Sequence, residues 1–105
     1  MTGMSGWHYL LLGGMLEIAW AISAKARPWW TVPISMAAGG GSVWCLYAAL
    51  ETMPIGTAYA VWTGIGAAGS ALVGIWLFGE STSALRLGSL ALVGVGLVGI
   101  GLSSR

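Results

Sequence analysis

Apolar residues fill four long runs along the chain, and short polar segments separate these runs. The runs cover residues 7–24, 29–50, 54–78 and 85–102. Because about 20 apolar residues cross the hydrocarbon core of a bilayer, each run predicts a transmembrane helix. Connectors of a few residues make consecutive helices antiparallel neighbours. We therefore predict an all-α, multi-pass protein of the cell (inner) membrane, with residues 1–105 forming a single four-helix transmembrane domain.

The composition supports a membrane protein and narrows its chemistry. Hydrophobic residues make up 57% of the chain and charged residues 7%, whereas a soluble domain carries about 25% charged residues. A single cysteine (Cys45) and a single histidine (His8) are too few for a metal cluster. Four lysines and arginines form no basic patch for nucleic acid. We therefore expect no enzymatic activity, cofactor, metal or nucleic-acid partner.

Glu17 stands in the middle of the first apolar run. Counted from Trp7 at 1.5 Å per residue, it lies roughly 15 Å deep, near the bilayer midplane. An ionisable residue at that depth costs on the order of 2.5–3.5 kcal/mol. A structural carboxylate bonded to a neighbouring helix is one interpretation, but an uncharged Gln would serve that purpose. The pattern favours a carboxylate that binds a cation or a proton in a cavity, as in a proton-coupled carrier.

Few side chains within the apolar runs offer partners for this carboxylate. Trp20 shares the helix face of Glu17 at i, i+3, and Ser42 lies mid-way along the second run. Tyr59 and Trp62 lie one turn apart in the third run. A hydroxyl, a phenol and two indole N–H groups can all donate to a buried carboxylate, and aromatic faces receive cations. Their joint occurrence near the middle of three runs makes them candidate partners of Glu17.

Two glycines, Gly64 and Gly66, follow the aromatic pair in the third run. Glycine frees the backbone, so the pair could let this helix bend. Close packing against a neighbouring helix is the alternative, because small residues let two backbones approach. The sequence leaves both interpretations open.

The segment "PIGTAYAVWTGIGAAGSALVGIWLFGES" (54–81), together with the lone Glu of the first run, resembles the small multidrug resistance transporters. The resemblance covers nearly the whole chain. Two features resemble the guanidinium-exporter branch of that family: "LEIAW" (16–20), in which the drug-exporting branch usually has Gly in place of Trp20, and "AVWTGIG" (60–66). This branch often carries a Lys near the end of the fourth helix, and the present chain has none there.

The resemblance implies a binding site at Glu17, Trp20, Ser42, Tyr59 and Trp62, and a proton-coupled antiporter that exports guanidinium or small guanidinyl cations. The paired N–H groups of guanidinium match a carboxylate in a bidentate fork. In that scheme Trp20 and Ser42 hold the Glu17 oxygens, Trp62 forms an apolar wall, and Tyr59 donates to Glu17. Because guanidinium keeps its protons near pH 7, the coupling proton must be carried by Glu17.

Four short helices are too few to enclose a cavity with two gates, so we expect a dimer. If the two chains insert in opposite directions, they form an inverted repeat that supports alternating access. A stripe of small residues in the last run, including Gly94 and Gly101, is a candidate dimer contact. The basic residues give only a weak orientation bias, with three on the side of the first and third connectors and one on the other: Lys25, Arg27, Arg86 and Arg105. An antiparallel homodimer and a heterodimer with a related chain both remain open.

Two other functions fit the sequence less well. An exporter of bulkier quaternary or polyaromatic drug cations would need space beside Glu17 that Trp20 fills. A non-transporting membrane component, such as a proton-conducting rotor subunit, also buries one carboxylate. Such a hairpin needs only two helices, and the four runs with the Tyr59 and Trp62 pair count against it.

Overall fold

The computed structural model describes residues 6–26 and 28–103 as four helices and their connectors. The helices are α1 (Gly6–Ala26), α2 (Thr31–Ala49), α3 (Ile55–Phe78) and α4 (Ala84–Ser103). All four are long and apolar enough to cross a membrane, so the predicted all-α transmembrane fold is confirmed. The second helix begins two residues later than predicted, because Trp29 and Trp30 lie in a turn that the Thr31 amide closes on the Pro28 carbonyl at 2.9 Å.

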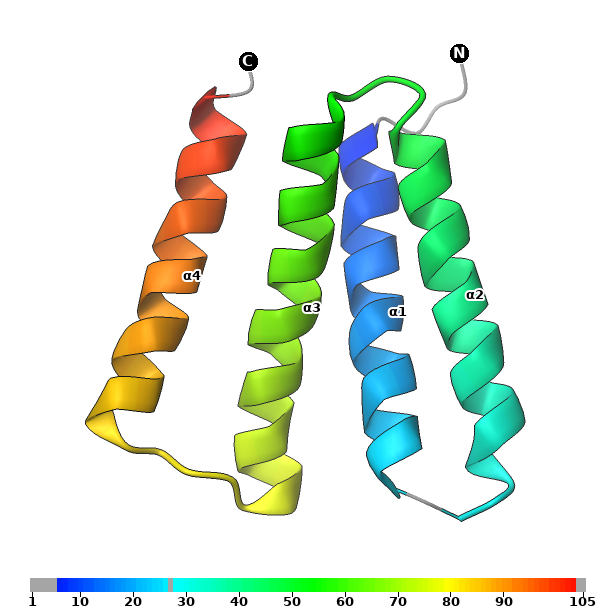
Figure 1. Ribbon diagram of the computed structural model, residues 1–105, viewed down its shortest axis with the longest axis vertical. Helices are drawn as coiled ribbons and strands as arrows, with labels where there is room; N and C mark the ends of the chain where they lie inside the picture. The colour runs from blue at the N-terminus through cyan, green and yellow to red at the C-terminus, as the bar shows by residue number, and fades with distance from the viewer. Residues whose placement is uncertain (1–5, 27, 104–105) are drawn as a thin grey trace.

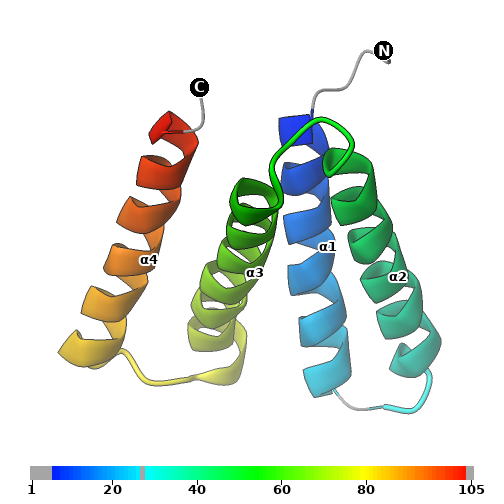
Figure 2. The same ribbon diagram turned by 45° about the horizontal axis from the view of Figure 1, so that its top comes forward.

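The helices form one curved layer in the order α4, α3, α1, α2 (Figure 1). The molecule measures 41 × 35 × 18 Å, and its thickness is less than two helix diameters of about 10–12 Å. Helix α1 packs against both α2 and α3, while the backbone of α4 comes close to α3 alone among the described helices. A view turned by 45° keeps this order (Figure 2). The layer therefore exposes two broad faces.

Glycines bring α1 and α3 into close contact. A Cβ added at Gly14 would lie 2.5 Å from the Ile65 side chain, and one added at Gly69 would collide with Ile18. These two positions keep the backbones close both before and after Glu17.

Gly64 and Gly66 also lie at helix contacts. A Cβ at Gly64 would collide with Leu97 of α4, and one at Gly66 would lie 3.0 Å from the Cβ of Glu17. Helix α3 runs without a break through both glycines. Close packing therefore accounts for them in this conformation, and bending of α3 stays a prediction.

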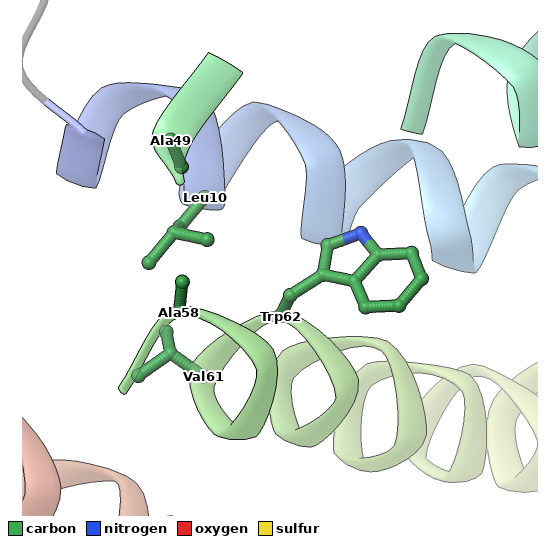
Figure 3. Close-up of a cluster of buried hydrophobic side chains, with 5 residues drawn as sticks. All are labelled: Leu10, Ala49, Ala58, Val61 and Trp62. Atoms are coloured by element: carbon green, nitrogen blue, oxygen red, sulfur yellow. The ribbon is translucent and has the colours of Figure 1, made fainter. Parts of the chain in front are cut away.

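The largest buried cluster lies where α1, α2 and α3 meet, nearer the end that carries the α2–α3 connector. Its members are apolar side chains from all three helices (Figure 3): Leu10, Ala49, Ala58, Val61 and Trp62. Trp62 is the largest of them and points from α3 toward α1 (Figure 3). This cluster fixes the rotation of α3, and with it the position of the Trp62 indole.

Helix α4 has no buried residue. A Cβ added at Gly94 would meet nothing within 4 Å, whereas one at Gly101 would lie 3.6 Å from the Trp7 ring of the same chain. Gly94 is therefore free to contact a second chain, and Gly101 already faces α1. The dimer contact predicted at these two glycines stays a prediction.

Apart from Glu17, the charged side chains of the described residues lie at or beyond the ends of the helices. Lys25 lies in the last turn of α1, Glu80 in the α3–α4 connector, Arg86 in the first turn of α4 and Glu51 in the α2–α3 connector. Arg27 and Arg105, which entered the orientation argument, lie outside the described residues.

Candidate functional site

Glu17 lies half-buried on α1, on the side that faces α3. Its Oε1 accepts a hydrogen bond from the indole Nε1 of Trp20 at 2.8 Å. The i, i+3 spacing places both side chains on one helix face, as the sequence predicts. The missing side chain of Gly66 leaves room for the Glu17 stem. The carboxylate is thus held at one oxygen by a neutral donor, and its charge is not cancelled within the described residues.

Ser42 links three helices one turn before Glu17. Its hydroxyl is fully buried, donates to the Gly13 carbonyl at 2.6 Å and accepts from Trp62 Nε1 at 2.8 Å. The Gly13 carbonyl is also the acceptor for the Glu17 amide in an α-helix. Ser42 of α2 therefore bonds to the α1 backbone one turn before the carboxylate, and Trp62 of α3 bonds to Ser42.

This arrangement corrects the role expected for Ser42. The sequence analysis places its hydroxyl on a Glu17 oxygen, but its single proton goes to Gly13 instead. The Trp62 N–H is likewise used by Ser42, so Trp62 offers its ring rather than its N–H toward Glu17. Sequence spacing gives the depth of a residue in the membrane but not the direction of its hydroxyl.

Tyr59 contacts Trp62 but does not line the cavity beside Glu17. Its ring lies 5.6 Å from the Trp62 ring at an angle of 48°, and 54% of the residue is exposed. Within residues 6–26 and 28–103, its hydroxyl has no hydrogen bond to Glu17. The donation expected from the resemblance is therefore not made in this conformation, because Tyr59 lies on an open face of the layer.

A cavity of about 680 Å³ opens beside the carboxylate, between α1 and α2. Trp62 of α3 and side chains of α1 and α2 line it: Glu17, Trp20, Ala24, Thr31, Val32, Ser35, Met36, Gly39, Val43 and Trp62. Its volume is within the range of small-molecule sites, about 300–1,000 Å³, and most of its wall is apolar. Glu17 is the only charged residue of this lining, so the cavity suits a small organic cation.

The sequence analysis missed the part of this wall that α2 provides. Ser35, Gly39 and Val43 recur at a spacing of four and share one helix face. The Ser35 hydroxyl also lies 2.7 Å from that of Ser23 on α1, which ties the two helices at the edge of the cavity. That periodicity, ending next to Ser42, is the signal that could have identified this face.

Comparison with known proteins identifies the family. The family model described as Small Multidrug Resistance protein matches residues 5–93. The chain belongs to the small multidrug resistance family. As a member of this family it is a multi-pass transporter of the cell (inner) membrane for small cationic substrates, and not an enzyme.

Relatives in the small multidrug resistance family include three guanidinium exporters. That of Citrobacter freundii is 49% identical over 103 residues, covering 94% of this chain and 98% of the relative. Those of Yersinia pestis and Escherichia coli K12 are 45% and 44% identical, covering 93% and 94% of this chain and 98% of each relative. The resemblance to the exporter branch, expected from the sequence, is confirmed.

Replacing Ser42 by Ala is expected to destabilise the fold by about 1–2 kcal/mol, because it leaves the buried Trp62 N–H without an acceptor. Unfolding in detergent, followed by tryptophan fluorescence, measures this loss. The double variant Ser42→Ala/Trp62→Phe removes both partners and should cost less than the sum of the single changes. Strictly additive losses would show that the two side chains do not interact.

Proposed function

We propose that this chain exports guanidinium or small guanidinyl cations in exchange for protons, by alternating access, and that Glu17 binds either the cation or the proton. The observation that carries the proposal is a single carboxylate, oriented by Trp20, in an otherwise uncharged cavity. The guanidinium exporters among its relatives, which align over almost the whole chain, support the same substrate.

The free groups of Glu17 fit a guanidinium ion. Trp20 occupies one side of Oε1, and Oε2 has no hydrogen-bond partner among the described residues. A carboxylate accepts at both oxygens, so two parallel N–H···O bonds can form with a planar fork of donors. The indoles of Trp20 and Trp62 line the same cavity and offer π faces to the cation.

Proton coupling follows from competition for the same oxygens. Guanidinium does not release a proton near pH 7, whereas a carboxylate can bind and release one. A protonated Glu17 loses its charge and with it the attraction for the cation. Each exit of a cation can therefore be linked to an entry of protons.

A second copy would complete the site. The layer leaves the cavity open and Tyr59 exposed, so one chain provides no outer wall. In an antiparallel dimer, two Glu17 residues would face one cavity, and exchange of the two conformations would move the opening from one side to the other. We place the contact at α4, whose residues are unburied.

Radiolabelled guanidinium uptake into proteoliposomes tests the proposed function. We expect uptake driven by an outward proton gradient, and a weaker exchange signal when the gradient is abolished. Guanidinium uptake at the same rate with and without the gradient would refute proton coupling. Transport of tetraalkylammonium ions without transport of guanidinium would favour the drug-exporting alternative.

Replacing Trp20 by Gly is expected to lower guanidinium affinity about 10- to 100-fold, because the hydrogen bond to a charged carboxylate is lost. It should also shift preference toward bulkier cations, because the indole occupies part of the cavity wall. Competition assays with guanidinium and tetraalkylammonium ions measure both effects. Trp44→Gly, at an exposed Trp outside the cavity lining, controls for a glycine inside a helix. Equal loss of affinity in both variants would contradict a specific role of Trp20.

A further inference from the structure

A second, smaller pocket lies at the end of the molecule that carries the first and third connectors. Its volume is about 250 Å³, and the C-terminal parts of α1 and α3, with the start of the following connector, form its walls, which include Ile22, Lys25, Ser70, Phe78 and Glu80. It shares no lining residue with the cavity beside Glu17. Its two charged residues carry opposite signs, which distinguishes it from the cation site.

The negative wall is built by the end of α3. Gly79 adopts a left-handed conformation with φ of 63°, which ends the helix, and the Glu80 amide then donates to the Gly74 carbonyl at 3.2 Å. The Glu80 carboxylate lies against Gly74, where a Cβ would collide with its Oε1. Arg86 Nη2 donates to Oε1 at 2.8 Å. Arg86 therefore holds the Glu80 carboxylate through Oε1 and leaves Oε2 free for another donor.

The positive wall is built by the last turn of α1. Lys25 lines the pocket from the side opposite α3, and it takes part in no ion pair within the described residues. Ser70 adds a hydroxyl from α3. The pocket thus offers a cation, a hydroxyl and a carboxylate within one hollow.

The pocket lies at the membrane boundary. Lys25 is eight residues beyond Glu17, or about 12 Å along the helix from the bilayer midplane. Glu80 follows directly after α3 ends at Phe78. The hydrocarbon core extends about 15 Å from its midplane, so both charges lie near its edge, and the long Lys25 stem can carry its ammonium to the headgroups. Ile22 and Phe78 add apolar wall to the same pocket.

We propose that this pocket binds the zwitterionic phosphoethanolamine headgroup of a bilayer phospholipid. Lys25 would contact the phosphate, and the free oxygen of Glu80 would accept from the ammonium. An ammonium with three N–H donors suits a carboxylate, whereas a trimethylated choline offers no donor and a glycerol headgroup offers no positive charge. The inference rests on this pocket alone and is independent of the substrate carried at Glu17.

Native mass spectrometry of the purified protein, released from micelles that contain equal amounts of phosphatidylethanolamine, phosphatidylcholine and phosphatidylglycerol, tests the proposal. We expect preferential retention of phosphatidylethanolamine by the unaltered chain. Lys25→Gln and Glu80→Gln should each lower this preference about five-fold, the upper range for a partly exposed charge pair. Guanidinium binding should stay unchanged in both variants.

Arg86→Gln is the matched control. It breaks the same ion pair as Glu80→Gln but keeps the carboxylate, so the preference should persist. Equal retention of the three lipids by the unaltered chain, or its preference for phosphatidylglycerol, would overturn the proposal. This outcome does not depend on whether the variants fold. Soluble phosphoethanolamine should not displace the lipid at equal concentration, and displacement would assign the pocket to a free solute instead.

Discussion

Replacing Glu17 by Gln is expected to reduce guanidinium binding at least about 100-fold and to abolish proton-coupled exchange, because it leaves the cation without a counter-charge. Gln keeps the size of the side chain and an oxygen for the Trp20 N–H, so the fold should stay intact. Binding to the purified protein and exchange in proteoliposomes, each measured across a pH series, check both parts. In the unaltered chain, guanidinium binding should weaken as pH falls, because protons compete for Glu17.

Two variants serve as controls for this result. Glu51→Gln removes an exposed carboxylate from the α2–α3 connector and should leave binding and exchange unchanged. Glu17→Asp keeps the charge on a shorter stem and should retain binding with an altered pH profile. Normal proton-coupled exchange by the Glu17→Gln variant would show that another group couples the two fluxes.

Replacing Gly94 by Leu is expected to weaken dimerisation and to reduce transport in parallel. A Cβ at this position meets nothing within 4 Å in the chain, so the substitution should not disturb the fold of the protomer. A leucine side chain would separate two α4 helices that approach through their small residues. Förster transfer between labelled protomers in liposomes measures association, and guanidinium uptake measures transport.

Gly96→Leu is the matched control for Gly94→Leu. Gly96 also has open space around it, but two residues along a helix turn the side chain to the opposite face. Loss of association in the Gly96 variant alone would place the contact on that other face. Cross-links that join only parallel chains would refute the antiparallel arrangement.

The four helices could be predicted because their signal is local. A run of about 20 apolar residues is sufficient for a membrane span, whatever the neighbouring helices do. The contact between Glu17 and Trp20 could also be predicted from a local signal, because a spacing of three residues on one helix brings two side chains together. Their hydrogen bond is the part of the site that sequence reasoning placed correctly.

The remaining contacts depend on how the helices rotate about their axes. The sequence placed Ser42 and Trp62 at the depth of Glu17, but their hydrogen bonds join each other and Gly13. That rotation is set by the apolar cluster around Leu10 and by glycines that leave room for a single side chain of the neighbouring helix. Nearly all-apolar helices carry little amphipathic pattern, so hydrophobic periodicity does not fix these rotations, and the spacing of Ser35, Gly39 and Val43 is the one signal for the cavity face of α2.

The Ser42 hydroxyl has a consequence for how the carrier can move. It joins α1, α2 and α3 at a single depth through two buried hydrogen bonds. Separating these helices at that level would leave polar groups unpaired in a medium without water, whereas tilting their ends about it breaks neither bond. In the proposed alternating access we therefore expect α1, α2 and α3 to tilt together about the depth of Ser42, with both hydrogen bonds kept.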